Sequence, residues 1–260
     1  MNRNLEALFD LSGKTAVITG AGSGLGKAIA EAMGEAGASV ACIDIDSGAA
    51  KETSDGIRKL DVDSTYLKCD VSKEDEVKET FKSISAHYGR VDILFNNAGV
   101  SGPNANLLQV SLEEWNHVIN INLTGMFLCA REAIRLMVEQ RSGKIVNTAS
   151  IWSYRGGYPV LMVPPYHAAK GALISLTKEL ALEYARDGIH VNAIVPGFFA
   201  TNLSARIKDE KFRAGLVPSI PLGRVGMPED MKGTALFLAS KASDYLTGAA
   251  IVVDGGYMSK

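Results

Sequence analysis

The chain has 260 residues, 47% of them hydrophobic and 22% charged, which permits one α/β domain or two small ones and is ample for a buried core. Its formal net charge of −2 argues against a phosphate-tracking surface, so we expect no nucleic acid partner. Three cysteines, Cys42, Cys69 and Cys129, are far apart and odd in number, and they indicate neither a disulfide framework nor a metal site.

The first ten residues are polar and mixed in charge, without the basic start and apolar run that a secretory signal needs. No stretch of 18 or more apolar residues follows, so we expect no membrane span. A reducing cytoplasm is the simplest setting for this sequence, and we expect a cytoplasmic protein.

A glycine-rich turn, Thr19-Gly-Ala-Gly-Ser-Gly-Leu-Gly26, lies between a short apolar strand pattern at 15–18 and an amphipathic helix pattern. A helix that begins at such a turn leaves its first N–H groups unpaired, and its dipole favours negative charge there. The turn therefore predicts a diphosphate site, with a tight structural turn as the alternative. Its glycine spacing, Gly20, Gly24 and Gly26, differs from the common G-x-G-x-x-G fingerprint.

The second strand pattern, 39–44, ends in Asp44, 18 residues after Gly26. In a nucleotide-binding βαβ unit, a carboxylate at this point accepts hydrogen bonds from the adenosine ribose and repels a 2′-phosphate. Ser23 adds no positive charge that could hold such a phosphate. Asp44 therefore favours NAD over NADP, unless it only caps a helix or closes a turn.

The remaining strand and helix patterns alternate along the chain, which predicts right-handed parallel crossovers and a doubly wound sheet. The seven strand patterns are 15–18, 39–44, 65–70, 91–95, 144–150, 188–195 and 250–253. Ligands of such sheets bind beyond the carboxyl ends of the strands, where Gly20, Asp44, Asp70 and Asn96 lie.

The second half of the chain continues this pattern without a linker-like break. A long helix is predicted over 115–138, where Asn120 and Asn122 interrupt the apolar face in a way that core packing alone does not explain. The mixed segment 198–227 is the best candidate for a mobile cover over the site.

Tyr166 and Lys170 are four residues apart in a predicted helix and therefore share one face. A free tyrosine has a pKa of about 10, and a nearby lysine cation would stabilise its phenolate. A solvated helix pair is the alternative for two such residues alone, but the upstream glycine turn favours a catalytic pair.

The chain resembles the classical short-chain dehydrogenase/reductase family over nearly its whole length. The resemblance rests on Thr19-Gly-x-x-x-Gly-x-Gly26, Asn96-Asn-Ala-Gly99, Asn122 with Gly125, Ser150 at a strand end, Tyr166-His-Ala-Ala-Lys170, Pro196-Gly197 with Thr201, and Asp254-Gly-Gly256. It implies a single Rossmann-type domain over residues 1–260, with a seven-stranded parallel sheet and helices on both faces. The family usually forms tetramers through its two long helices and its C-terminal segment, so a homotetramer is expected.

The resemblance also implies an NAD-dependent interconversion of a secondary alcohol and a ketone, with Tyr166 as general acid or base. Ser150 would bind the substrate oxygen, Lys170 would hold the nicotinamide ribose, and Asn122 would anchor a water that relays protons to Lys170. The residues expected at the cofactor are Gly20, Ser23, Gly24, Leu25, Gly26, Asp44, Asp70, Val71, Asn97, Ala98, Gly99, Tyr166, Lys170, Pro196, Gly197 and Thr201. A non-catalytic dinucleotide sensor or scaffold would have no reason to keep the four catalytic residues together.

One spacing departs from the family pattern, because Ser150 precedes Tyr166 by 16 residues rather than the usual 13, which Ser153 has. Ser150 has the strand-end context, so we favour it and expect a longer loop beside the substrate. The residues of this loop expected at the substrate, in addition to Ser150, are Trp152, Tyr154, Arg155 and Tyr158. Aromatic side chains with one cation suit a ring-shaped acid such as a sugar acid, and Phe9-Asp-Leu-Ser-Gly13 also looks like the gluconate dehydrogenases of the family. Local packing of the aromatics around a solvated Arg155 is the alternative.

Overall fold

Seven parallel strands form one sheet in the order β3-β2-β1-β4-β5-β6-β7 in the computed structural model, which describes residues 5–203 and 205–259. The strands are β1 (Thr15–Thr19), β2 (Ser39–Asp44), β3 (Ser64–Lys68), β4 (Ile93–Asn96), β5 (Gly143–Thr148), β6 (Ile189–Pro196) and β7 (Ala250–Val253). The prediction of a doubly wound seven-stranded parallel sheet is confirmed.

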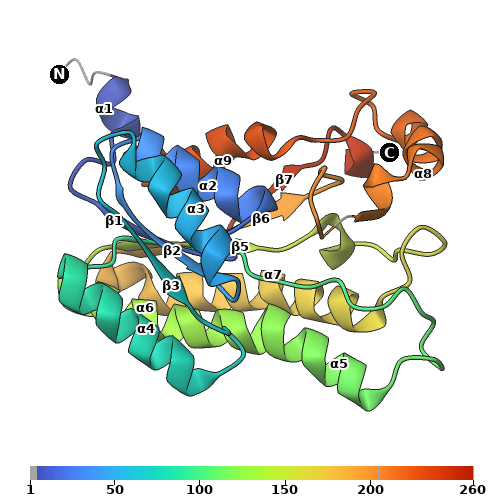
Figure 1. Ribbon diagram of the computed structural model, residues 1–260, viewed down its shortest axis with the longest axis horizontal. Helices are drawn as coiled ribbons and strands as arrows, with labels where there is room; N and C mark the ends of the chain where they lie inside the picture. The colour runs from blue at the N-terminus through green and yellow to red at the C-terminus, as the bar shows by residue number, and fades with distance from the viewer. Residues whose placement is uncertain (1–4, 204, 260) are drawn as a thin grey trace.

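Helices cover both faces of the sheet (Figure 1). The α-helices are α1 (Glu6–Phe9), α2 (Gly24–Glu35), α3 (Ser47–Arg58), α4 (Glu74–Tyr88), α5 (Leu112–Ile119), α6 (Gly125–Gln140), α7 (Pro164–Tyr184), α8 (Glu210–Leu216) and α9 (Lys232–Ala239). Helices α2, α3 and α9 lie on one face, and α4, α5, α6 and α7 lie on the other. Two buried apolar clusters therefore fill the space on either side of the sheet.

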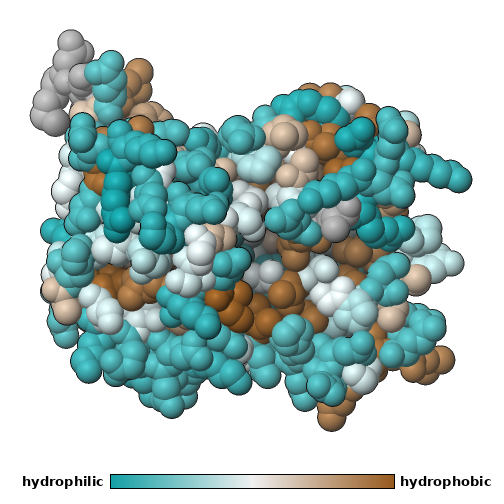
Figure 2. Space-filling view, viewed as in Figure 1, coloured by the Kyte–Doolittle hydropathy of each residue, from teal (hydrophilic) through white to brown (hydrophobic). Residues whose placement is uncertain are grey.

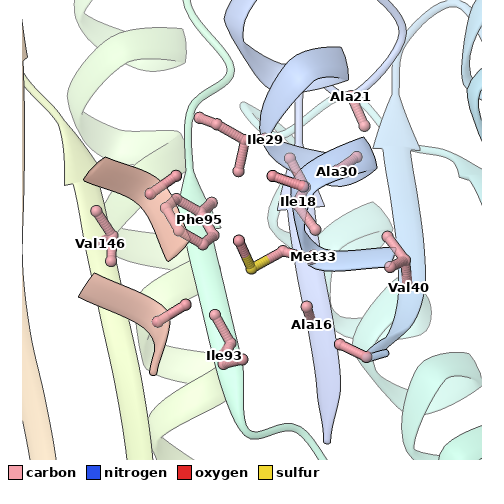
Figure 3. Close-up of a cluster of buried hydrophobic side chains, with 14 of the residues drawn as sticks. Ala16, Ile18, Ala21, Ile29, Ala30, Met33, Val40, Ile93, Phe95 and Val146 are labelled. Carbon is pink, nitrogen blue, oxygen red and sulfur yellow. The ribbon is translucent and has the colours of Figure 1, made fainter. Parts of the chain in front are cut away.

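The cluster under α2 shows how the sheet and its first helix fit together (Figure 3). Met33 points from α2 onto the sheet, where Ile18 of β1 and Phe95 of β4 pack around it. All three side chains are fully buried. Burying a side chain of this size contributes about 1.5–3 kcal/mol relative to leaving it exposed, so this packing holds α2 against the sheet.

The strand order reverses between β1 and β4, since the chain leaves β3 and returns to the other side of β1. In an open parallel sheet, the loops that leave the two neighbouring strands at such a point diverge and leave a crevice beyond their carboxyl ends. The turn after β1 and the segment after β4 both lie here. The topology thus places the glycine turn beside the Asn-Asn-Ala-Gly segment.

The long helix predicted over 115–138 is helical throughout in the structure, but its middle turn is a π-helix rather than an α-helix. Helices α5 and α6 are joined by η1 (Asn120–Thr124), a turn of π-helix in which the Gly125 amide donates to the Asn120 carbonyl. Such π-turns are frequent at functional sites, and this one contains Asn122.

No helix in residues 5–203 or 205–259 is long and apolar enough to cross a membrane.

Candidate active site

The glycine turn joins β1 to α2 with two backbone positions that favour glycine. Gly20 and Gly24 have φ of +67° and +54°, in the left-handed region that side chains rarely adopt. Gly26 is required for a different reason, because a Cβ there would lie 1.9 Å from the Gly20 carbonyl oxygen. Gly20 and Gly24 line the cavity described below, whereas Gly26 closes the turn from within.

The start of α2 has free hydrogen-bonding capacity that suits a diphosphate. Ser23 is the N-cap residue, and its side chain makes no capping hydrogen bond, so the first amides of the helix have no side-chain acceptor there. Ser23, Gly24 and Leu25 line the cavity. Backbone amides and a helix dipole directed at one point fit the phosphates of a dinucleotide.

Asp44 lies at the end of β2 beside this turn. Its carboxylate accepts hydrogen bonds from the Gly22 amide at 2.8 Å and from the Asp46 amide at 3.0 Å. Helix α3 is capped by Asp46 instead, which excludes a helix cap as the role of Asp44. Asp44 also lines the cavity, so its carboxylate is available to ribose hydroxyls while it fixes the turn.

The segment after β4 is hydrogen-bonded to the end of β1 through the Thr19 hydroxyl and through the Asn97 side chain, which donates to the Thr19 and Gly20 carbonyls. Thr19 Oγ1 accepts from the amides of Asn97 and Ala98, at 2.9 and 3.0 Å. Asn97, Ala98 and Gly99 line the cavity next to Asp70 and Val71, which follow β3. The structure therefore brings these five predicted cofactor residues to one wall.

The cavity has a volume of about 660 Å³ and lies beyond the carboxyl ends of the strands. Figure 2 shows the face on which the molecule is hollowed, with apolar side chains exposed between polar rims. Pro196, Gly197 and Thr201, which follow β6, line it from the other side. Of the predicted cofactor residues, Gly26 alone does not line it.

Tyr166 and Lys170 lie one turn apart in α7 and are both buried. Lys170 Nζ lies 5.6 Å from the centre of the Tyr166 ring and donates a hydrogen bond to the Thr148 carbonyl at 2.7 Å. A side-chain hydrogen bond joins Tyr166 and Ser150. These three side chains line the cavity together.

Burial controls the acidity of both α7 groups. It raises the pKa of the Tyr166 phenol to about 12, against a smaller lowering by the hydrogen bond with Ser150. It lowers the pKa of the Lys170 ammonium to about 7. The attraction of the lysine cation for the phenolate, which the sequence predicts, is therefore opposed by the larger cost of removing both charges from water.

Asn122 is fully buried in η1 and does not line the cavity. Its side chain accepts from the Val100 amide at 2.9 Å and donates to the Val100 carbonyl at 2.7 Å. A Cβ on Gly99 would lie 2.5 Å from Asn122 Oδ1 and 3.7 Å from Lys170 Nζ, so the two side chains flank this glycine. Asn122 is near Lys170, but its amide group is committed to the backbone after β4.

The two serines after β5 have different surroundings. Ser150 accepts from the Trp152 amide at 3.2 Å and faces Tyr166 in the cavity. Ser153 donates to the Lys170 carbonyl at 2.7 Å and does not line the cavity. The strand-end context, rather than the spacing from Tyr166, therefore identifies the serine beside the tyrosine.

The loop after Ser150 does not present its side chains as expected. Trp152 lines the cavity, but Tyr154, Arg155 and Tyr158 do not. All three are exposed, and the guanidinium of Arg155 lies 4.9 Å from the centre of the Tyr257 ring. The turn of 3₁₀-helix at η2 (Ile151–Ser153) directs Trp152 inward and the following residues outward.

Several cavity residues were missed by sequence reasoning. They come from the segment after Gly99, from α5, from the loop after Ser150 and from the expected cover, and they are Ser101, Asn104, His117, Val160, Leu161, Phe198, Phe199, Asn202, Leu203, Arg206, Ile207 and Phe212. For the members of this set between 198 and 212, the mixed composition of segment 198–227 indicated that they would lie over the site. For the others, the sequence contains no such indication. Among the described residues, no group of three or more His, Cys, Asp or Glu side chains could hold a metal ion.

Comparison with known proteins gives full-length matches. A family model described as enoyl-(acyl carrier protein) reductase matches residues 20–258. The 2-dehydro-3-deoxy-D-gluconate 5-dehydrogenase of Bacillus subtilis (strain 168) is 39% identical over 257 residues, covering 98% of this chain and 99% of the relative.

Two solved structures are similar over the same extent. A short-chain type dehydrogenase/reductase from Mycobacterium marinum has a TM-score of 0.94 and 40% identity, covering 99% of this chain and 100% of that one. A gluconate 5-dehydrogenase from Burkholderia cenocepacia J2315, in complex with NADP and tartrate, has a TM-score of 0.93 and 34% identity, with the same coverage.

Proposed function

The chain belongs to the classical short-chain dehydrogenase/reductase family, and from this membership we propose that it interconverts a secondary alcohol and a ketone of a sugar acid with NAD(H). It is an oxidoreductase of this family with a nicotinamide dinucleotide cofactor. The observation that carries the proposal is the buried contact of Ser150, Tyr166 and Lys170 in one cavity with the glycine turn. When bound, the nicotinamide supplies the redox chemistry, accepting two electrons from an alcohol carbon or returning them to a ketone carbon.

Tyr166 is the proton-transfer group in this proposal. In the oxidising direction its phenolate oxygen takes the hydroxyl proton of the substrate, and in the reducing direction the phenol returns it. Ser150 donates or accepts a hydrogen bond at the same substrate oxygen and so fixes its distance from Tyr166. Both side chains are more than nine-tenths buried, which keeps the proton from exchanging with bulk water.

Lys170 assists this transfer through its charge. The pKa of the Tyr166 phenol is raised to about 12 by burial, so a phenolate near neutral pH requires positive charge close by. Lys170 Nζ, hydrogen-bonded to the Thr148 carbonyl, is held beside the tyrosine ring, and its lowered pKa of about 7 lets it also release a proton near neutrality. We propose that Asn122 positions the backbone of Gly99 and Val100 beside Lys170. A water held by this backbone would relay protons to Lys170.

The sugar-acid part of the proposal is supported by similarity to enzymes named for gluconate and 2-dehydro-3-deoxy-D-gluconate. Its NAD part is supported by the charges that line the cavity. Among the described residues, Lys170 and Arg206 are the only lysine or arginine side chains lining it, and neither lies beside Asp44. A 2′-phosphate there would meet a carboxylate without a compensating cation.

The proposal is tested by replacing Tyr166 with phenylalanine. Removal of the phenolic oxygen is expected to lower kcat by about 10²–10⁴-fold, because general acid/base catalysis contributes this much. Turnover is followed by absorbance at 340 nm with D-gluconate and other sugar acids, and NADH binding by fluorescence. NADH affinity is expected to stay within about threefold, since the ring remains in place.

Tyr154→Phe is the matched control, because this tyrosine is exposed and does not line the cavity. It should retain the turnover of the unmodified enzyme. If Tyr166→Phe turned over at more than a tenth of the unmodified rate, the role of Tyr166 would be rejected. If the unmodified protein bound NADH but showed no turnover, a dinucleotide sensor would be favoured.

A further inference from the structure

Arg206 reaches the cavity from η4 (Ala205–Lys208), in the segment expected to cover the site. One of its Nη atoms donates a hydrogen bond to the Val160 carbonyl at 3.1 Å, which ties this segment to the loop that follows Ser150. Its guanidinium carbon lies 4.5 Å from the centre of the Phe212 ring. The arginine is thus fixed at two points on the wall opposite the glycine turn.

The charge of Arg206 has no carboxylate partner among the described residues. Several other surface arginines do, as in the pairs Arg224–Asp230 and Arg141–Asp187. A guanidinium has five N–H donors, and the bond to Val160 uses one of them. The contact with the Phe212 ring helps to hold the guanidinium in place, and its other N–H donors have no hydrogen-bond partner among the described residues.

The charges that line the cavity are separated by sign. Asp44 and Asp70 lie at the ends of β2 and β3, beside the glycine turn. Lys170 and Arg206 lie at the other end, with Tyr166 and the cover. No aspartate or glutamate lines this second end within the described ranges, so its electrostatic potential is positive and favours an anionic substrate.

We propose that Arg206 binds the carboxylate of the substrate in a bidentate pair and selects sugar acids over neutral polyols. This inference rests on the proposed function, since it names the residue that reads the acid group at the same site. A planar carboxylate matches the guanidinium fork, which gives two parallel charge-assisted hydrogen bonds. Arg155, the arginine expected for this role, is exposed over Tyr257 and does not line the cavity.

The experiment compares D-gluconate with D-glucitol, which carries a CH₂OH group where gluconate carries its carboxylate. Arg206→Gln keeps a donor for the Val160 carbonyl but removes the charge, and Arg206→Lys keeps the charge but removes the fork. Arg155→Gln is the matched control. For each variant, kcat and KM are measured for both compounds, and gluconate binding to the enzyme–NADH complex is measured by tryptophan fluorescence, since Trp152 lines the cavity.

Loss of a charged hydrogen-bonding pair is expected to raise the KM for gluconate by about ten- to hundredfold in Arg206→Gln, with kcat changed less than about threefold. Arg206→Lys should fall between Arg206→Gln and the unmodified enzyme. Glucitol kinetics should change less than about twofold in every variant, because no carboxylate is present. Arg155→Gln should leave both compounds unaffected.

Equal effects of Arg206→Gln on gluconate and glucitol, no effect on either, or a gluconate-specific loss in Arg155→Gln would each overturn the inference. Fluorescence separates this failure from failure of the proposed function. If gluconate binds the NADH complex in an Arg206-dependent way without turnover, Arg206 keeps its role and the proposed reaction is wrong. If the unmodified NADH complex does not bind gluconate, the inference is overturned while the assignment of Tyr166 is unaffected.

Discussion

The Asp44 carboxylate is held by backbone amides and at the same time faces the cavity. It accepts hydrogen bonds from the Gly22 and Asp46 amides, which orient it, and it still lines the cavity. A Cβ on Gly22 would lie 2.9 Å from Asp44 Oδ2, so the glycine is needed for the carboxylate to approach the turn this closely. The same side chain therefore shapes the turn and, in the function proposed above, also selects the cofactor.

Replacing Asp44 with alanine is expected to reduce the preference for NAD. The unmodified enzyme should show a kcat/KM for NAD at least about tenfold above that for NADP, corresponding to about 1.4 kcal/mol. Asp44→Ala should lower kcat/KM for NAD by about ten- to hundredfold, because charged hydrogen bonds to the ribose are lost, and bring the two cofactors close to equality. Steady-state rates at 340 nm with both cofactors measure this.

Asp46→Ala is the control for loss of backbone support, since Asp46 caps α3 but does not line the cavity. Its NAD to NADP ratio should match that of the unmodified enzyme. Faster turnover of the unmodified enzyme with NADP would contradict the role given to Asp44.

The glycine turn and η1 are two elements that fix the position of the main chain around the site. The turn brings Gly20 and Gly26 into contact, so α2 begins directly beside β1. In η1, the π-turn holds Asn122 against Val100 and thereby fixes the segment after β4. The glycine turn has residues with positive φ, and η1 is a π-helical turn. Neither geometry is needed for ordinary packing of helices and strands.

Gly26→Ala is expected to destabilise the protein by about 1–3 kcal/mol and to weaken NADH binding, because its Cβ would overlap the Gly20 carbonyl and push α2 away from the turn. Urea unfolding at fixed protein concentration and NADH fluorescence titration measure the two effects. Gly56→Ala provides the comparison, since a Cβ at this exposed position inside α3 meets nothing within 4 Å.

In Gly56→Ala, the helix loses a flexible residue without a clash, and we expect a gain in stability of about 0.5–1 kcal/mol with unchanged NADH affinity. If both alanine variants behaved alike, the close contact between Gly26 and Gly20 would not be what fixes the turn.

At the scale of the molecule, both edge strands of the sheet, β3 and β7, are incompletely covered. None of the four residues of β7 is fully buried, whereas all five residues of β1 are. Parallel strands are ordinarily covered on both faces, so β7 is placed for contact with another chain. Phe127 of α6 and Leu182 of α7 are also exposed, at 45% and 79%. We propose that these surfaces form the contacts of a homotetramer, as the family resemblance implies.

Leu182→Glu is expected to convert a tetramer into smaller species, because a carboxylate would be buried without a partner at the contact. Sedimentation velocity at micromolar protein concentration measures the mass. Leu60→Glu is the control, since Leu60 is exposed at 49% outside α6, α7 and β7, and this variant should remain tetrameric. A monomeric unmodified protein, or an unchanged mass in Leu182→Glu, would contradict the proposal.

The sequence alone determined those features that depend on local pattern and order along the chain. The seven strand patterns, the glycine turn, Asp44 at a strand end and the Tyr166–Lys170 pair are each specified by residues close together in the sequence. Because parallel strands end at the same edge of a sheet, these local features were sufficient to place Gly20, Asp44 and Asp70 along one cavity. Asn96 was expected there too, but it is fully buried, and its side-chain amide donates to the Met126 carbonyl and to Asn147 instead.

Only the tertiary structure decided which side chains face the substrate and how strongly the catalytic groups are buried. Arg155 and Arg206 are both cations in irregular segments, and their directions depend on Tyr257, Val160 and Phe212, which are distant in sequence. The opposite pKa shifts of Tyr166 and Lys170 likewise arise from the surrounding packed elements. Local pattern carries no information about such long-range contacts, because they are fixed by how the layers pack rather than by the residues beside them.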